Sequence, residues 1–212
     1  IQEAIDVSEN GDSIFVDPGI YFENINFSGK SIVLSSNYIE GNDSLLIGTT
    51  IIDAGNVGSV VTFNSGENSN AILQGFTIQN GNGNDEDPDN NGSFYTYGGG
   101  IYCENSDPII KDCIIQNNTA NEGGGAGIFC YESSPMFSGC TIKENETDDV
   151  GGGLYARDGS SPSFLDCVFF DNIAEFGGGC YLKSSSTPFF ENVSFIQNTA
   201  NNSGGGIGLK DD

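Results

Sequence analysis

A glycine-rich motif recurs five times along the C-terminal half of the chain, and this periodicity constrains the fold more than any other feature. Each copy joins glycines to a short apolar pair, as in Gly98-Gly99-Gly100-Ile101-Tyr102. The copies begin 26 or 27 residues apart, at positions 98, 125, 151, 177 and 204. Prolines 108, 135, 162 and 188 keep the same rhythm. Repetition of this kind indicates one structural unit stacked on itself several times.

Within each period, apolar residues alternate over short runs that Gly, Ser, Asn and Pro interrupt, which is typical of strands rather than helices. About three short strands per period match one coil of a parallel β-helix, in which coils stack at an inter-strand distance of roughly 4.8 Å. We therefore predict an all-β, single-stranded parallel β-helix of seven or eight coils. Equivalent residues should form ladders, and the inward ones are Ile101/Ile128/Leu154/Cys180/Ile207, Ile110/Phe137/Phe164/Phe190 and Cys113/Cys140/Cys167/Val193. A fourth ladder, Asn118/Asn145/Asn172/Asn198, fits buried amides that satisfy backbone groups.

Residues 1–212 should form one β-helix segment with four parts. Residues 1–10 contain a short helix, Ile1–Val7, that covers the open end of the stack. Residues 11–80 are irregular first coils, residues 81–97 are an acidic loop insertion, and residues 98–212 are the regular repeats. Because the last residues follow a motif that elsewhere opens a full repeat, we expect the chain to be a segment of a longer one. An unpaired last coil would then favour end-to-end self-association.

The charge balance excludes several functions. Thirty acidic residues against six basic ones give a net charge of −24, so the basic patch that nucleic-acid binding needs is missing. The chain has no histidine, which rules out a histidine base or ligand within it. No apolar run approaches the roughly 18 residues that span a bilayer, so membrane insertion is not expected.

The opening of the chain resembles that of pectin-lyase-like right-handed β-helix proteins, in Ile1-Gln2-Glu3-Ala4-Ile5 and the later Val16-Asp17-Pro18-Gly19. The regular repeats are similar to those of polymorphic outer-membrane adhesins, which join a GG-small-apolar motif (Gly99-Gly100-Ile101) to a Phe-x-x-Asn motif (Phe169 to Asn172). The resemblance implies a right-handed coil and a secreted or cell-surface protein, often adhesive.

Six cysteines fall into the predicted ladders. Neighbouring coils would bring their Cα atoms within the range that a disulfide permits, roughly 4.4–6.8 Å. One column nevertheless holds three cysteines, Cys113, Cys140 and Cys167, and its next position is Val193. Cysteine therefore takes the place of a small apolar residue there, and we expect reduced, buried thiols.

The acidic loop holds a candidate metal site. Asp85, Asp87, Asp89 and Asn91 alternate with other residues, and Gly92 follows. Asp-x-Asp-x-Asn-Gly is the start of a calcium loop, in which oxygens at alternate positions converge. The twelfth position, where such loops carry Glu, is occupied by Gly98, and no helices flank the loop. The alternatives are a weak Ca²⁺ site and a solvated acidic loop.

Four aromatic residues should form an outward column. If Ile101 and Cys103 face the core, the residue between them faces away, and the same parity holds in the following coils. The column consists of Tyr102, Phe129, Tyr155 and Tyr181. We interpret it as a ring stack that stabilises the sheet or as a platform that binds a sugar or a partner protein.

Carboxylates on neighbouring coils permit a glycosidase-like pair. Glu144 and Asp171 lie one coil apart, and Asp112 and Asp166 lie two coils apart. Such pairs arise by chance among 30 acidic residues, and the charge of −24 would repel a uronate polymer. We assign no catalytic residues.

The sequence favours a non-catalytic structural or adhesive β-helix region of a larger secreted or cell-surface protein, with a surface glycan or a host or partner protein as its ligand. The alternative is a carbohydrate-active enzyme or carbohydrate-binding module of the pectin-lyase-like fold.

Overall fold

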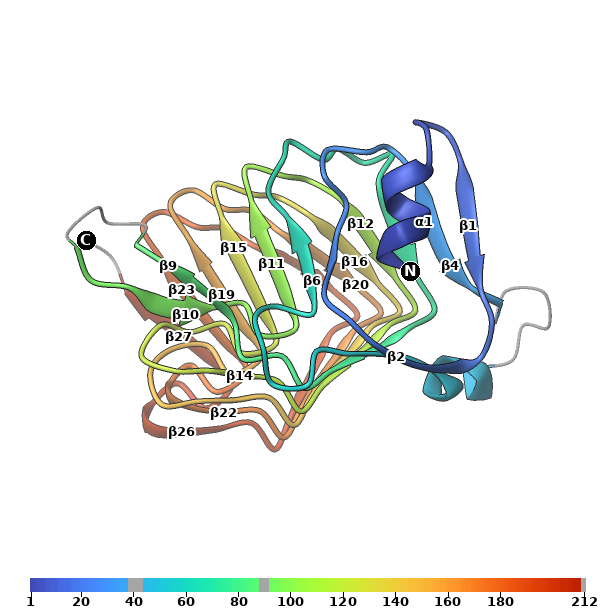
Figure 1. The fold of residues 1–212 in the computed structure, drawn as a ribbon. Helices are drawn as coiled ribbons and strands as arrows, with labels where there is room; N and C mark the ends of the chain where they lie inside the picture. The colour runs from blue at the N-terminus through green and yellow to red at the C-terminus, as the bar shows by residue number, and fades with distance from the viewer. Residues whose placement is uncertain (38–43, 88–91, 211–212) are drawn as a thin grey trace.

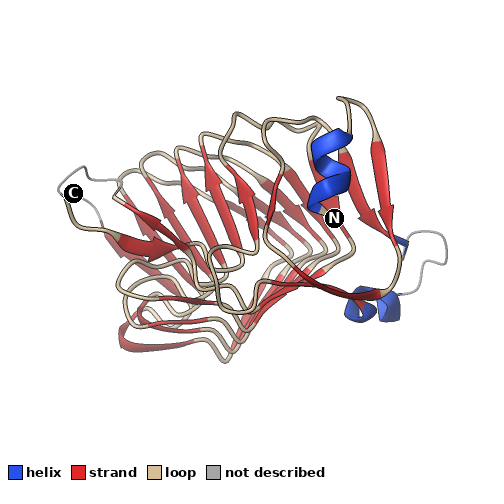
Figure 2. Cartoon of the chain, viewed as in Figure 1, coloured by secondary structure: helices blue, strands red, loops and turns tan. Residues whose placement is uncertain are grey.

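The chain winds into a parallel β-helix of seven coils (Figures 1 and 2). This computed structural model describes residues 1–37, 44–87 and 92–210. Strands that are neighbours within the parallel sheets lie a whole coil apart in sequence, so these sheets are built by stacking rather than by hairpins. The predicted fold class and number of coils are confirmed.

Three long parallel sheets, each of seven strands, form the walls of the solenoid. The first sheet contains β1 (Ser13–Val16), β4 (Val33–Ser36), β7 (Ile72–Gln74), β12 (Ile109–Lys111), β16 (Met136–Ser138), β20 (Ser163–Leu165) and β24 (Phe189–Glu191). The second contains β2 (Gly19–Phe22), β5 (Thr50–Asp53), β8 (Thr77–Gln79), β13 (Ile114–Gln116), β17 (Thr141–Lys143), β21 (Val168–Phe170) and β25 (Ser194–Ile196). The third contains β3 (Ile25–Asn26), β6 (Val61–Phe63), β11 (Ile101–Glu104), β15 (Ile128–Tyr131), β19 (Leu154–Arg157), β23 (Cys180–Lys183) and β27 (Ile207–Lys210).

A shorter sheet adds a fourth strand to the later coils. It contains β14 (Thr119–Ala120), β18 (Glu146–Thr147), β22 (Ile173–Phe176) and β26 (Thr199–Ser203). The remaining elements are helix α1 (Gln2–Val7), the 3₁₀ helix η2 (Ser44–Thr49) and the pair β9 (Asn84–Glu86) and β10 (Tyr95–Tyr97). Strands β9 and β10 pair antiparallel, so the insertion at residues 81–97 is a hairpin at its base rather than only an acidic loop.

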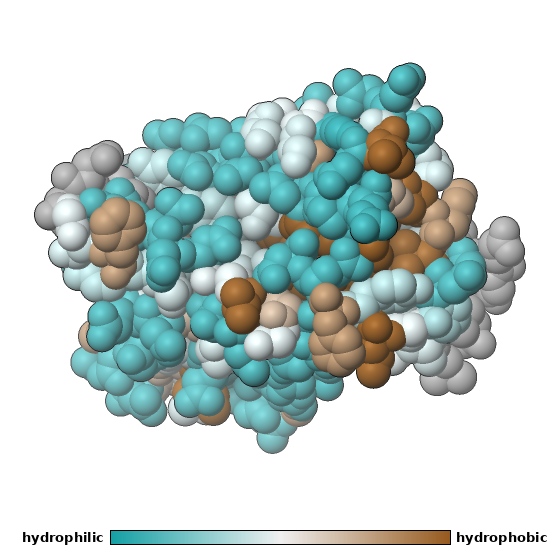
Figure 3. All heavy atoms as spheres, viewed as in Figure 1, coloured by the Kyte–Doolittle hydropathy of each residue, from teal (hydrophilic) through white to brown (hydrophobic). Residues whose placement is uncertain are grey.

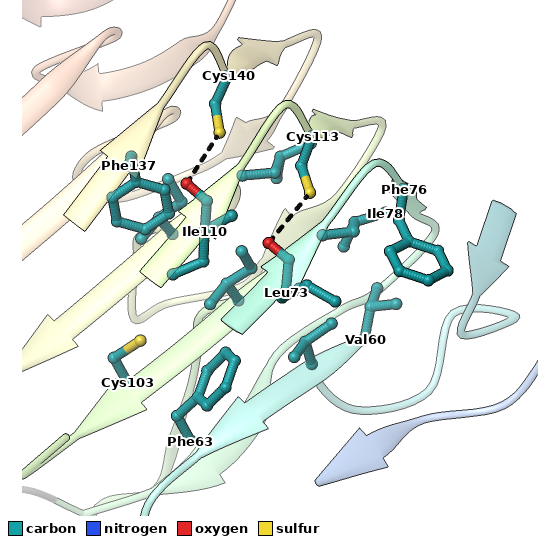
Figure 4. Packing of buried hydrophobic residues seen from close by; sticks show 14 of the residues in the cluster. Val60, Phe63, Leu73, Phe76, Ile78, Cys103, Ile110, Cys113, Phe137 and Cys140 are labelled. Carbon is teal, nitrogen blue, oxygen red and sulfur yellow. Dashed lines mark hydrogen bonds between the residues drawn. The ribbon is translucent and has the colours of Figure 1, made fainter. Parts of the chain in front are cut away.

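The predicted inward ladders occur in the predicted register. Ile101 pairs with Ile128, and Ile110 pairs with Phe137. Their side chains belong to one hydrophobic core cluster, part of which Figure 4 shows from close by. All six cysteines are buried and free, which agrees with the expectation of reduced thiols. Cys113 and Cys140 donate to the carbonyls of Leu73 and Ile110 at 4.0 and 3.6 Å (Figure 4).

The corners between strands use the left-handed backbone conformation. In the regular coils the first and second sheets meet at Asp112, Gly139, Asp166 and Asn192, all with φ between 48° and 64°. Gly151 has φ of 69° at the glycine-rich corner, and a Cβ on the adjacent Gly152 would lie 2.6 Å from the Ile173 carbonyl oxygen. The repeated glycines are therefore needed for positive φ and for close approach of successive backbones.

The N-terminal helix covers the first coil as predicted. Ile5 is fully buried against the core. The Lys30 ammonium donates to the carbonyls of Asp6 and Ser8 at 2.7 and 2.9 Å, so a cation satisfies the C-terminal end of the helix. The Ile1 amino group pairs with Glu23 at 2.7 Å and fixes the other end.

The surface seen in Figure 3 is largely hydrophilic, and its hydrophobic residues gather towards the N-terminal coils and α1. Among the described residues, the structure contains no helix that is long and apolar enough to cross a membrane.

Candidate binding site

The outward aromatic column exists, but it is not exposed. Tyr102, Phe129, Tyr155 and Tyr181 occupy equivalent positions of successive strands, and adjacent ring centroids lie 5.4–5.8 Å apart. All four point away from the main core, yet none is more than 8% exposed. The expectation of an open aromatic platform is therefore corrected.

A second layer of chain covers these rings. The residues that precede the glycine-rich corners, Tyr97, Val150 and Phe176, belong to one column of parallel bridges and pack against the rings. The corner is so tight that a Cβ on Gly98 would lie 2.9 Å from the Cα atom of Tyr102. The segment before each corner consequently runs across the outer face of the strand that follows, and a second hydrophobic cluster forms there.

The covering layer opens at the last coil. Tyr181 pairs with Gly208, so a glycine continues the aromatic column, and Phe176 pairs with Ser203, so a serine continues the covering column, which also contains Gly124. We call the resulting hollow of about 470 Å³ the C-terminal pocket. It is lined by Asp149, Val150, Tyr155, Phe176, Tyr181, Lys183, Ser203, Leu209 and Lys210. Two of the four predicted ligand-binding residues, Tyr155 and Tyr181, therefore reach a pocket, whereas Tyr102 and Phe129 do not line it.

The charged groups of the pocket come from different strands. Lys183 of β23 and Lys210 of β27 are direct neighbours in the parallel register. Burial raises the pKa of the Asp149 carboxyl and nearby Asp148 raises it further, while Lys210 and Lys183 act in the opposite direction. Neither lysine forms an ion pair within the described residues.

The two tyrosines offer hydroxyl groups to the pocket. Neither the Tyr155 nor the Tyr181 hydroxyl has a hydrogen-bond partner in the part of the chain that the structure describes. Burial raises the pKa of both tyrosines, so both hydroxyls stay protonated and can donate at neutral pH. The pocket thus combines aromatic edges, free donors and two cations.

Sequence reasoning missed the charged members of this pocket. The mixed column beside the aromatic one runs Glu104, Tyr131, Arg157 and then Lys183, and its next member is Lys210. Extending that column by one repeat would have placed two lysines side by side. The sole arginine is not available to the pocket, since Arg157 is buried, pairs with Asp158 and lies over the Tyr131 ring.

The predicted calcium ligands lie only partly within the described residues. Asp85 is exposed on β9, and the Asp87 carboxylate accepts a hydrogen bond from the Gly92 amide at 2.7 Å. Asp89 and Asn91 lie outside the described residues. Within the described part of the chain, no three metal-ligating side chains gather into a site.

The carboxylates that spacing suggested as a catalytic pair are corner residues. Glu144 and Asp171 directly follow the equivalent strands β17 and β21, with φ of 55° and 52°. Their amides donate to Phe170 and Ile196 of the next coil at 3.1 and 3.0 Å. Asp112 and Asp166 occupy the preceding corner with the same conformation. The left-handed backbone conformation of the corners therefore explains why these acidic residues recur at equivalent positions.

Comparison with known proteins agrees with this architecture. The family described as right-handed beta helix region matches residues 4–212. The chain belongs to this family. Its coil is accordingly right-handed, as the resemblance implied. No curated protein sequence matches the chain.

Solved structures of pectin methylesterases share the pectin-lyase-like fold. One, in complex with a hexasaccharide, has a TM-score of 0.56 and 14% sequence identity over 94% of this chain. This chain spans 62% of that enzyme. The pectin methylesterase from Yersinia enterocolitica has a TM-score of 0.49 at 14% identity, covering 98% of this chain and 93% of the enzyme. At such identity the likeness concerns the fold alone.

Proposed function

We propose that this β-helix is a non-catalytic structural and adhesive region of a secreted or cell-surface protein, with a surface glycan or a partner protein as its ligand. The proposal is supported by one contrast. The paired carboxylates Glu144 and Asp171 are corner residues of the solenoid, whereas the C-terminal pocket gathers two lysines that form no ion pair among the described residues. A pocket with aromatic walls and a few polar groups is suited to binding.

The stacked construction suits a load-bearing role. Each coil is joined to the next by parallel strands in three sheets, and the asparagine ladder also joins the later coils, so the stack is suited to act as one rigid rod. A rigid rod holds a lateral pocket at a fixed distance and orientation from its attachment, which favours adhesion.

Glycan-array and cell-surface binding, measured beside enzymatic assays, test this function. We expect retention of a glycan or partner, with no reducing sugar, unsaturated uronate or methanol released from esterified pectin. The second candidate is a carbohydrate-active enzyme, which the fold shared with the pectin methylesterases suggests. Product formation that disappears in Glu144→Gln or Asp171→Asn would replace the adhesive function by this one.

A further inference from the structure

We propose that the outer face of the first sheet binds a second copy of this chain, side by side and antiparallel, to form a closed dimer. The inference goes beyond the proposed adhesive function and does not depend on it. It also differs from the end-to-end association expected from the sequence, because the contact lies on the flank of the solenoid rather than at its ends.

An apolar row runs along this face. In four successive strands of the first sheet, the residue before the core residue points outward and pairs in register with its equivalents. These residues are Val33, Ile72, Ile109 and Met136. Met136 is 41% exposed, and the other three are half-buried. A serine ends the row on each side, since Ser13 pairs with Val33 and Ser163 pairs with Met136. The row is therefore short, apolar in the middle and polar at both ends.

The pattern of this row is the same in both directions. A two-fold axis parallel to the strands, passing between Ile72 and Ile109, places each of these residues opposite the other one of the second copy. The same axis places Met136 opposite Val33, and the serines at the two ends also meet. Both copies have the same coil spacing of roughly 4.8 Å, so the match holds along the whole row. Such an interface uses the same surface of both copies and closes at the dimer.

A hollow lies where the two-fold axis places Met136 of the second copy. Its volume is about 400 Å³, and its apolar lining consists of Val33 and Ile72. Its polar lining includes Asn10, Asp12, Ser31 and Asn70. Methionine is unbranched and flexible, so it fills an irregular apolar gap well. By symmetry, the Met136 side chain of each copy fills the hollow of the other.

The charged residues beside the row favour this register. Lys111 and Asp107 lie two residues to either side of Ile109. The two-fold axis places Lys111 opposite Gln74, its register equivalent in the preceding coil. It places Asp107 opposite Asn70, so no like charges meet. An axis moved onto Ile109 would place each lysine opposite a lysine and each aspartate opposite an aspartate, which is destabilising.

The size of the face sets the expected affinity. Six coils at roughly 4.8 Å and five residues at roughly 3.3 Å give a face of about 500 Å². A standard interface buries roughly 800 Å² per partner, so we expect a dimer that dissociates at micromolar concentration.

Sedimentation equilibrium of the whole chain, from about 1 to 200 μM, tests the inference. We expect monomer and dimer with no larger species. Met136→Glu removes the apolar contact and adds a negative charge to an acidic molecule, so it should weaken the association at least tenfold. Met136→Leu keeps the apolar volume and should stay within about threefold of the wild type. Ile196→Glu is the matched control, because Ile196 is 45% exposed on the second sheet, and it should leave the association unchanged.

Disulfide trapping tests the register. Val33→Cys and Met136→Cys are prepared as separate proteins and treated with oxidised glutathione, each alone and both mixed. We expect a cross-linked dimer in the mixture only, because the axis places these two positions opposite each other. In either variant alone the new thiols lie about three coil spacings apart, roughly 14 Å, which a disulfide cannot bridge. The six native thiols are buried.

The polar neighbours of the row give a second test of the register. Gln74→Glu offers a carboxylate to Lys111 of the second copy and should tighten the dimer severalfold, whereas Gln74→Lys should weaken it. Gln74 and Lys111 are also neighbours within one chain, so the readout is the association constant rather than the thermal midpoint.

Four results would overturn the inference. They are a monomer at every concentration, growth beyond the dimer that Met136→Glu leaves unchanged, cross-linking of Met136→Cys with itself, and no cross-linking in the mixture. Growth that ignores Met136→Glu would assign self-association to the ends of the solenoid. None of these results concerns ligand binding, so the adhesive function is tested separately by its own assays.

Discussion

Asn145 and Asn172 stack one coil apart and share their hydrogen bonds. The side-chain Nδ2 of Asn145 donates to Oδ1 of Asn172 at 2.9 Å, and the backbone N–H of Asn145 donates to the same oxygen at 3.2 Å. Both residues are fully buried. The ladder that begins at Asn118 and ends at Asn198 therefore satisfies backbone groups inside a turn where no strand partner exists.

Removing one member of this ladder should destabilise the solenoid. Asn145→Ala leaves the Asn118 amide and the Ile115 carbonyl without their partner, so we expect a loss of about 3 kcal/mol in the free energy of unfolding. Urea unfolding followed by circular dichroism measures it. Asn201→Ala, at an exposed position on β26, is the control and should change stability by less than about 0.5 kcal/mol. Equal effects of the two variants would contradict the structural role of the ladder.

A buried ring of the second hydrophobic cluster should contribute as much to stability as a buried ring of the main core does. Phe129 is fully buried, and its ring lies 4.7 Å from the Tyr97 ring and 5.4 Å from the Tyr155 ring. Phe129→Ala should cost about 3–5 kcal/mol, because it opens a cavity between the sheet and the covering layer. Phe22→Ala, at a position 76% exposed, is the comparison and should be nearly neutral in thermal unfolding. A mild effect at Phe129 would mean that the covering layer is not packed against the column.

Glu86 on the hairpin should make stability fall as pH rises. Burial raises the pKa of this carboxyl, and Glu104 and Asp85 raise it further. The folded state therefore holds a proton that the unfolded state has released, so stability is lost as pH rises from about 4.5 through the folded pKa. Glu86→Gln should stabilise the neutral-pH protein by no more than about 0.5 kcal/mol, since solvent screens a half-exposed group, and the gain should shrink below that window.

Thermal midpoints recorded from pH 4 to 8 test the Glu86 prediction. Glu9→Gln, at an exposed position away from the hairpin, is the control and should show the wild-type pH profile. A gain for Glu86→Gln that grows as pH falls would reverse the sign and reject this account.

The cysteine thiols should not react with a thiol reagent while the protein is folded. Burial raises the pKa of the Cys113 thiol to about 12 and that of Cys180 well above its ordinary value, so these two thiols hold little thiolate at pH 8. The hydrogen bond to Cys140 lowers the pKa of Cys167, but this residue, like the other cysteines, is buried and out of reach of a reagent. Ellman's reagent should therefore titrate none of the six thiols in buffer and all six in guanidinium chloride. Ser69→Cys, at an exposed site, is the positive control and should add one fast-reacting thiol. Rapid reaction of the wild-type protein would show that the coils open readily.

Calcium binding by the acidic loop stays a prediction. We propose that Ca²⁺ relieves repulsion among Asp85, Asp87 and their neighbours and raises the thermal midpoint by about 1–3 °C at millimolar concentration. EDTA should reverse the shift and Asp87→Ala should remove it, while Mg²⁺ should give a smaller one. The absence of a shift in the wild-type protein would leave only a solvated acidic loop.

The sequence predicted a large part of the fold because a solenoid repeats local rules. A spacing of 26–27 residues sets which side chains stack, and strand parity sets which of them face inward. Ile101 over Ile128, the buried cysteines and the asparagine ladder follow from these two rules alone. Helix α1 was visible as an amphipathic run before the first strand.

The candidate site was harder to predict. Strand parity tells which side chains point away from the core, but it does not tell whether another segment of the chain covers them. Tyr102 and Phe129 point away from the core, as predicted, and are nevertheless buried. The residues that cover the aromatic column precede the glycine-rich corners, and they are Tyr97, Val150 and Phe176. The C-terminal pocket lies where Gly208 continues the aromatic column and Ser203 continues the covering one.

The sequence by itself thus determined the period, the inward ladders and the corner residues, since each depends on contacts that repeat at a constant spacing. Only the tertiary structure decided which outward residues meet solvent and brought Lys183, Lys210, Asp149 and two tyrosines around one pocket. The physical reason is that this pocket is made by a departure from the repeat, between two layers whose packing depends on side-chain volume rather than on periodicity.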